Sequence, residues 1–226
     1  MRVPRILSGL TIAAVVLSGY GIAAASGPGL QPVAAVTTAA APAKVKAAAP
    51  AKVKAAAAKK YAFPVAAKKA SWHNTHSGYP ATDIFAACGS KFVATTSGVV
   101  LEISLKDKFK KGMKDGPYNG GLFVSILGDD GVRYYGSHLQ SVTTGIKKGV
   151  RVKTGQLLGK VGHTGNASGV CHLHYGISPP CAKAGDWKVR RGVVWPYTFL
   201  ASWRKGGQKN PGSAMRAWRN KHHCKA

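Results

Sequence analysis

Short apolar runs separated by glycine and polar residues recur through the middle of the chain. The clearest of them are residues 92–94, 99–103, 122–127, 132–135, 156–161 and 174–177. Runs of this length that are rich in β-formers and bounded by glycine predict antiparallel strands. Asp129-Asp130-Gly131, between two runs, predicts a hairpin turn. Because no long run with a 3.6-residue apolar period accompanies them, the sequence predicts a mainly β domain at residues 67–204.

The flanking segments have a different composition. Residues 26–66 are rich in Ala, Lys and Pro, and the eight residues 41–48 recur unchanged at 49–56. Such a stretch has little to bury, and its prolines oppose a continuous helix, so we expect a disordered basic linker. Two interpretations stay open, a tether to a negatively charged matrix and a solvated spacer. Residues 205–226 are expected to form a short basic C-terminal tail.

Residues 1–25 have the pattern of a signal peptide. Arg2 and Arg5 precede an apolar stretch that ends in small residues at positions 23–25. Serine, threonine and glycine interrupt this stretch, which argues against a membrane anchor. Tyr20 stands where a lipoprotein signal would place cysteine. We therefore expect a secreted bacterial protein, extracellular or associated with the cell wall, without a stable membrane anchor after signal cleavage.

The chain is strongly basic, with 33 Lys and Arg against 7 Asp and Glu and a net charge of +26. Residues 26–71 and 204–226 contain no acidic residue, so much of the excess lies in the two tails. Such a chain attracts polyanions, including wall teichoic acids, anionic lipid headgroups and nucleic acid. Nucleic acid is not the expected partner, because the tail lysines have few aromatic residues among them and no recognisable binding fold accompanies them.

One group of side chains indicates a metal site. His172 and His174 are two residues apart on a predicted strand, so both side chains point to the same face. A bend of the chain can bring His76 and Asp83 to them. Two imidazoles and one carboxylate leave a fourth tetrahedral position open, which is typical of catalytic rather than structural zinc.

A series of motifs resembles one known family. These motifs are the segments 83–90, 136–139, 152–159, 162–166 and 172–175. In this order they are similar to the lysostaphin-like (LytM-like) zinc metallopeptidases, over about residues 72–200. The resemblance implies an antiparallel β-sheet groove domain of the duplicated hybrid motif type. It also implies one Zn²⁺ and hydrolysis of peptidoglycan peptides.

The resemblance also implies the roles of individual residues. His76, Asp83 and His174 would hold the zinc, and His138 and His172 would be the catalytic histidines beside it. Which of the two is the general base stays open. The expected function is therefore a secreted zinc metalloendopeptidase that cleaves amide bonds in stem or cross-link peptides of peptidoglycan. The alternative is a catalytically silent domain of the same fold that binds peptidoglycan or activates another hydrolase.

Two positions depart from the family pattern. His76 and Asp83 are seven residues apart, whereas the family usually has four, so the intervening loop must bulge. His73 is the alternative ligand to His76. Gly176 stands where the family often has glutamate, so a carboxylate that would orient a ligand is missing or replaced.

The remaining features concern stability and substrate contact. Cys171 and Cys181 are close in sequence, and in an oxidising compartment we expect them to form a disulfide. Cys88 and Cys224 either pair or stay free.

His163 is expected at the rim of the site. An aromatic and basic cluster at residues 187–197 is interpreted either as the edge of the core or as a surface that contacts sugar and wall carboxylates.

Overall fold

The computed structural model describes residues 60–181 and 185–226, and within them the mainly β prediction is confirmed. The strands are β1 (Val65–Ala66), β2 (Ser71–Trp72), β3 (Thr82–Phe85), β4 (Lys91–Val93), β5 (Gly98–Ser104), β6 (Phe123–Gly128), β7 (Arg133–Ser137), β8 (Leu139–Val142), β9 (Arg151–Val152), β10 (Leu157–Val161) and β11 (His172–Ser178). The helices are α1 (Trp187–Arg190), α2 (Tyr197–Arg204) and α3 (Gly212–His222). The predicted signal peptide and most of the predicted linker lie outside the described residues.

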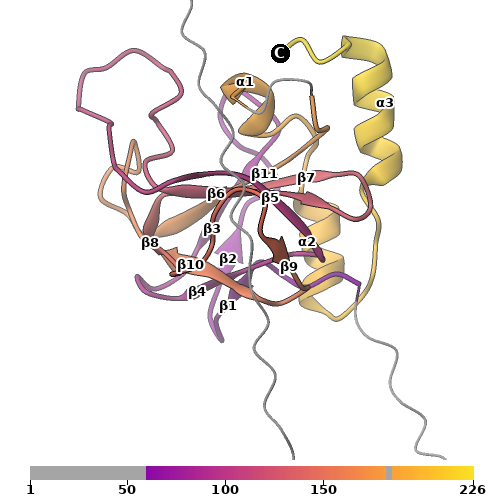
Figure 1. The fold of residues 1–226 in the computed structure, drawn as a ribbon, viewed down its shortest axis with the longest axis horizontal. Coiled ribbons are helices and arrows are strands. Elements are labelled where there is room, and N and C mark those ends of the chain that lie inside the picture. The colour runs from indigo at the N-terminus through magenta and orange to yellow at the C-terminus, as the bar shows by residue number, and fades with distance from the viewer. Residues whose placement is uncertain (1–59, 182–184) are drawn as a thin grey trace, which may run out of the picture. The chain divides into compact units, whose positions relative to one another are not determined.

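The strands form two antiparallel sheets. The larger has seven strands in the order β2-β3-β11-β7-β6-β5-β9, and the smaller has four in the order β1-β4-β10-β8. The turn between β6 and β7 contains Gly131, which has a left-handed φ of 76°, and the predicted hairpin is confirmed. Helix α1 and the loop between β5 and β6 lie on the side of the larger sheet that faces away from β4 and β10 (Figure 1).

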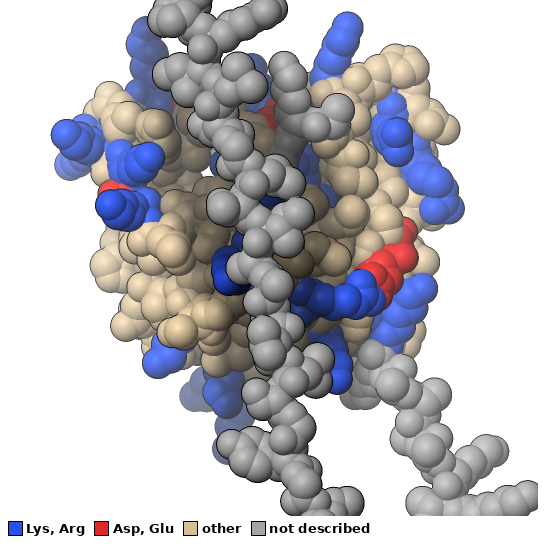
Figure 2. Space-filling model, viewed as in Figure 1, with Lys and Arg blue, Asp and Glu red and all other residues tan. Residues whose placement is uncertain are grey.

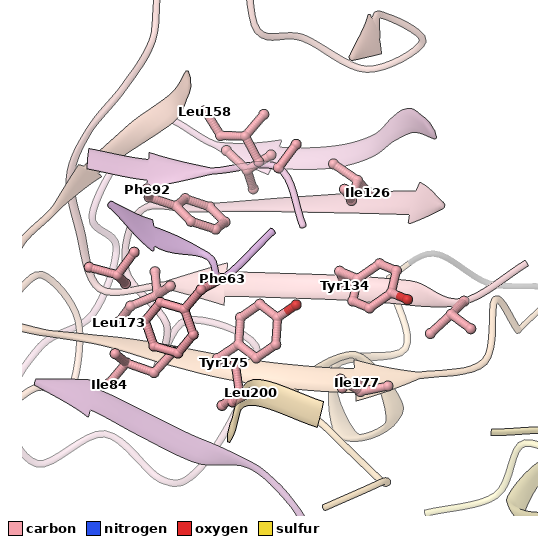
Figure 3. Packing of buried hydrophobic residues seen from close by; sticks show 14 of the residues in the cluster. Phe63, Ile84, Phe92, Ile126, Tyr134, Leu158, Leu173, Tyr175, Ile177 and Leu200 are labelled. Atoms are coloured by element: carbon pink, nitrogen blue, oxygen red, sulfur yellow. The ribbon is translucent and has the colours of Figure 1, made fainter. Parts of the chain in front are cut away.

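The core lies between the sheets because strand residues alternate between two faces. On β11, Leu173, Tyr175 and Ile177 are fully buried and point to the core. They meet Phe92 from β4 and Leu158 from β10 (Figure 3). The same alternation sends His172 and His174 to the opposite face, so the core residues of this strand support its histidines.

The two ends of the domain extend beyond the expected boundaries. Tyr61, which was placed in the linker, is 1 % exposed and stacks on Trp203 of α2 at 5.5 Å between ring centroids. Residues 205–226 were expected to be a basic tail, but the structure has helix α3 there, and its Met215 is buried in the core. The segment was misread because its charges dominate the composition while a few apolar positions pack inward.

The disulfides differ from the expected pairing. The prediction of a Cys171–Cys181 bond is wrong, because the structure has Cys88–Cys171 and Cys181–Cys224. Cys171 and Cys181 flank opposite ends of β11, and a seven-residue strand holds its ends about 20 Å apart. The antiparallel pairing of β11 with β3 instead places Cys171 beside Cys88. Neither Cys171 nor Cys224 is therefore free to bind a metal.

The Cys88–Cys171 bond closes the longer loop, with a sequence separation of 83 between the two cysteines. Replacing both cysteines by serine is expected to lower the free energy of unfolding by about 2–4 kcal/mol, because the unfolded chain regains entropy. Urea unfolding of the variant and of the wild type measures the difference. Peptide mapping without reduction gives a check on the pairing, and a Cys171–Cys181 peptide would contradict it.

Candidate active site

The register between β3 and β11 assembles the centre of the site. Asp83 lies directly opposite His174, and Phe85 lies opposite His172. Residues opposite each other in an antiparallel pair share a face, so the carboxylate and both imidazoles lie on the side away from the core. Leu173 and Ile84, one residue along each strand, pair on the core side.

His76 completes a group that could hold a metal. It comes from the loop between β2 and β3, and its ring centroid lies 4.9 Å from that of His174. Its Nε2 is 3.8 Å from Oδ1 of Asp83, and Nδ1 of His174 is 3.0 Å from the same oxygen. One ligand atom from each residue lies within 4.8 Å of the others. His73 is exposed and lies against Phe85 instead, at 5.8 Å between ring centroids.

The hydrogen bonds of these residues fit a cation. Nε2 of His174 lies 2.9 Å from the backbone oxygen of Arg191, which only accepts, so this nitrogen carries the proton. In neutral His174 the lone pair of Nδ1 then faces the Asp83 carboxylate, and two acceptors in contact need a positive charge between them. Nδ1 of His76 is buried without a hydrogen-bond partner among the described residues. A His, His, Asp donor set of this kind suits zinc.

Two more histidines point an imidazole nitrogen toward this group. His138 donates from Nδ1 to the backbone oxygen of Thr164 at 2.7 Å, and His172 donates from Nδ1 to that of Val170 at 2.8 Å. In the neutral rings, both Nε2 atoms are therefore proton acceptors. Nε2 of His172 lies 3.8 Å from Oδ1 of Asp83, and the rings of His138 and His172 lie 4.7 Å apart. His138 has a left-handed φ of 63°, a conformation that non-glycine residues adopt mainly where their surroundings impose it.

Burial and the neighbouring imidazoles decide the charge states in the absence of a metal. Burial, assisted by the neighbouring imidazoles of His174 and His172, lowers the pKa of His138 to about 3. Burial alone would raise the pKa of Asp83, but its close contact with His174 and the nearby imidazoles of His172 and His76 outweigh it and lower that pKa to about 2. The site thus favours a charged carboxylate and a neutral His138, the forms that a metal ligand and a proton acceptor need.

The site lies in a groove whose walls are loops. One wall is the segment that follows β2 and carries His76 and Tyr79, and a second is the loop between β5 and β6 with Asp115 and Asn119. The loop before β11 forms a third. Arg191, just after α1, lines the groove beside His174. The five predicted site residues all line this groove, whereas His163 is exposed and does not.

The comparisons with known proteins agree with this arrangement. Residues 74–184 match the model of peptidase family M23. This domain belongs to peptidase family M23. The match includes all five predicted site residues, and the family resemblance deduced from the motifs is confirmed.

Individual proteins and solved structures are similar to this chain over part of its length. The L-Ala--D-Glu endopeptidase of Bacillus subtilis is 31 % identical over 130 residues, which cover 55 % of this chain and 35 % of that protein. The chain thus spans about a third of the length of this curated relative. The catalytic domain of lysostaphin from Staphylococcus simulans is 24 % identical, with a TM-score of 0.44, and the match covers 59 % of this chain and 92 % of that one. A zinc-containing peptidase from Vibrio cholerae is 20 % identical, with a TM-score of 0.41, over 53 % of this chain and 36 % of that one.

A backbone carbonyl takes the place of the missing ligand-orienting carboxylate in the M23 domain. A Cβ on Gly176 would lie 2.3 Å from the backbone oxygen of Arg191, so only glycine admits this segment so close to β11. The same oxygen accepts the Nε2 proton of His174. Orientation of a ligand by such an acceptor is a usual property of metal sites. The sequence signalled the loss of the carboxylate but not its replacement.

Replacing Gly176 by alanine is expected to weaken zinc binding about 10- to 100-fold, because the added methyl group displaces the carbonyl that orients His174. Competition with a chromophoric chelator measures the affinity. Gly185→Ala is the matched control, since a Cβ there meets nothing within 4 Å. Equal zinc affinity of the two variants would show that the carbonyl does not orient His174.

The M23 domain also contains groups that sequence reasoning missed. Tyr79 and Asp115 had no motif around them, and the oxygens of Thr164 and Val170 belong to the backbone, which the sequence does not distinguish. Arg191 was named only as part of an aromatic and basic cluster.

The helices in the described parts of the chain are too short or too polar to span a membrane.

Proposed function

We propose that this chain is a secreted zinc metalloendopeptidase that hydrolyses amide bonds in the stem or cross-link peptides of peptidoglycan. The observation that carries the proposal is the group of His76, Asp83 and His174 in an open groove, with His138 and His172 beside it. Membership of a peptidase family supports hydrolysis of a peptide bond. The name of the Bacillus subtilis relative supports a cell-wall peptide as the substrate class.

His76, Asp83 and His174 would hold the zinc ion. When bound, zinc supplies a Lewis acid that polarises the amide carbonyl and lowers the pKa of water toward neutrality. The carbonyl of Arg191 keeps the proton of His174 on Nε2 and leaves Nδ1 free to coordinate. Asp83 contributes a negative charge that balances the cation.

His138 and His172 would transfer the protons. Each holds its Nδ1 proton against a backbone carbonyl, so each presents the lone pair of Nε2 to the groove. One Nε2 accepts a proton from the attacking water, and the resulting imidazolium returns a proton to the nitrogen of the leaving amine. A protonated imidazole beside the carbonyl also stabilises the negative charge that develops on its oxygen. Both rings are buried and hydrogen-bonded through Nδ1, so both Nε2 atoms are held in place.

The surface charge suits a cell-wall environment. Lys and Arg side chains are spread over the visible face of the described residues, and few acidic side chains lie among them (Figure 2). A surface of this kind attracts anionic wall polymers through a screened and largely non-specific field. Secretion rests on the signal peptide predicted at residues 1–25.

The proposal is tested by mass spectrometry of fragments that the zinc-loaded protein releases from purified, cross-linked peptidoglycan. The expected result is a new pair of peptide termini that identifies the cleaved bond. The termini should be absent after treatment with a chelator and return when zinc is added. If folded, zinc-loaded protein releases nothing from walls of several chemical types, the proposed activity is wrong, and binding to the same walls would then favour the silent binding domain.

A further inference from the structure

Arg191 is held rigidly at the edge of the groove. Its guanidinium carbon lies 3.8 Å from the centroid of the Tyr79 ring and 4.8 Å from that of Trp187. Its backbone oxygen is bonded to His174, so the whole residue is fixed next to the candidate metal ligand. Stacking on aromatic faces orients a guanidinium without using its hydrogen-bond donors. The stacking therefore fixes the guanidinium at the groove without using up its N–H groups.

The present partner of Arg191 is easy to displace. Nη1 donates to Oδ2 of Asp115 at 2.8 Å, and the side chain of Asp115 is 58 % exposed on the loop between β5 and β6. Exposed ion pairs of this kind contribute little to stability. Nε of Arg191 is buried and has no hydrogen-bond partner among the residues that the structure describes. An incoming carboxylate could thus replace Asp115 at the Nη end of the guanidinium, while Nε stays enclosed by the protein.

Arg190 adds a second positive charge behind the first. It is 6 % exposed, lies over the Phe123 ring at 4.3 Å, and pairs with Oε2 of Glu102 at 3.2 Å. Its Nε is also buried without a hydrogen-bond partner in the described part of the chain. Both arginines line one pocket together with His138 and His174. The pocket therefore joins the catalytic group to two guanidinium groups, each of which is paired with one carboxylate.

We propose that this pocket is a subsite for a substrate carboxylate, and that Arg191 determines the preference of the enzyme for an acidic residue beside the cleaved amide bond. This inference rests on the proposed function. A carboxylate matches the planar donor fork of arginine and accepts two hydrogen bonds from it. A neutral carboxamide at the same place supplies only one acceptor oxygen and no charge. The substrate class is thus a wall peptide with a free carboxylate, rather than its amidated form.

The test compares two synthetic stem peptides that differ only in a free carboxylate or a primary carboxamide on the residue next to the cleaved bond. The wild type is expected to show a kcat/KM about 10- to 100-fold higher for the carboxylate peptide. In Arg191→Gln this ratio should fall close to one. Arg191→Lys should keep part of the preference, because it retains the charge but not the fork. Lys188→Gln is the matched control, since Lys188 is exposed on α1 and loses the same charge outside the pocket.

An unchanged ratio in folded Arg191→Gln would overturn the subsite. If the wild type cleaves neither peptide, the proposed function fails instead. The binding of the two peptides then tests whether the carboxylate subsite exists. Titration calorimetry of the same two peptides with the wild type and Arg191→Gln provides this measurement. Tighter binding of the carboxylate peptide that depends on Arg191 would support the subsite, and equal binding of both peptides to the wild type would refute it.

Discussion

Replacing Asp83 by asparagine is expected to lower peptidoglycan hydrolysis more than about 100-fold, together with loss of bound zinc. The substitution keeps the shape of the side chain but removes the negative charge that lies 3.0 Å from Nδ1 of His174. Loss of a residue that only orients a ligand already costs about 10- to 100-fold in metal affinity or activity. Loss of a ligand should cost more. Metal analysis of the purified variant and fragment release from peptidoglycan measure the two effects.

Asp129→Asn is the matched control for this experiment. Asp129 lies at the β6–β7 hairpin and pairs with Arg151 away from the groove, so its loss should leave zinc content and hydrolysis unchanged. Full zinc content in Asp83→Asn would contradict the role of Asp83 as a ligand. The same measurement on His76→Ala and His73→Ala separates the two histidines, since only His76 lies in the group that could hold a metal.

Replacing His138 by alanine is expected to lower kcat about 10²- to 10⁴-fold while zinc stays bound, because the variant loses a proton-transfer group but no ligand. Steady-state kinetics on a synthetic cross-link peptide and metal analysis give both values. His163→Ala is the control, since His163 is exposed and lies outside the groove. Loss of zinc from the His138 variant would assign this residue to the metal instead.

Measuring kcat of His138→Ala and His172→Ala as a function of pH identifies the general base. Both histidines present Nε2 to the groove, and the structure gives them equivalent hydrogen bonds. The base should be the residue whose replacement also removes the acidic limb of the pH profile of kcat, since that limb reports protonation of the base.

The local pattern of the sequence was enough for six of the eleven strands in the described residues and for four of the five candidate site residues, whereas His138 was named from the family resemblance. Alternation along β11 separates His172 and His174 from Leu173 and Tyr175, and this separation is a property of any extended chain. Glycine and the short apolar runs likewise indicated β6, β7 and their hairpin. Strands β1, β2 and β9, of two residues each, and β3 and β8, of four residues each, were not predicted, because such short segments carry little readable period.

The pairing of distant segments could not be deduced in this way. The cysteines closest in sequence were expected to bond, but the strand between them keeps them apart, and the register of β3 with β11 selects Cys88 for Cys171. Helix α3 was taken for a solvated tail, because the burial of Met215 depends on neighbours that are remote in sequence.

The sequence by itself therefore determined which side chains are candidates for the chemistry, because residue type and strand alternation are local properties. Only the tertiary structure decided what surrounds them. It brings the carbonyl of Arg191 to His174 through the space left open at Gly176, and it places the guanidinium of the same residue over Tyr79 at the edge of the groove. Such contacts depend on close packing between segments that no local pattern connects.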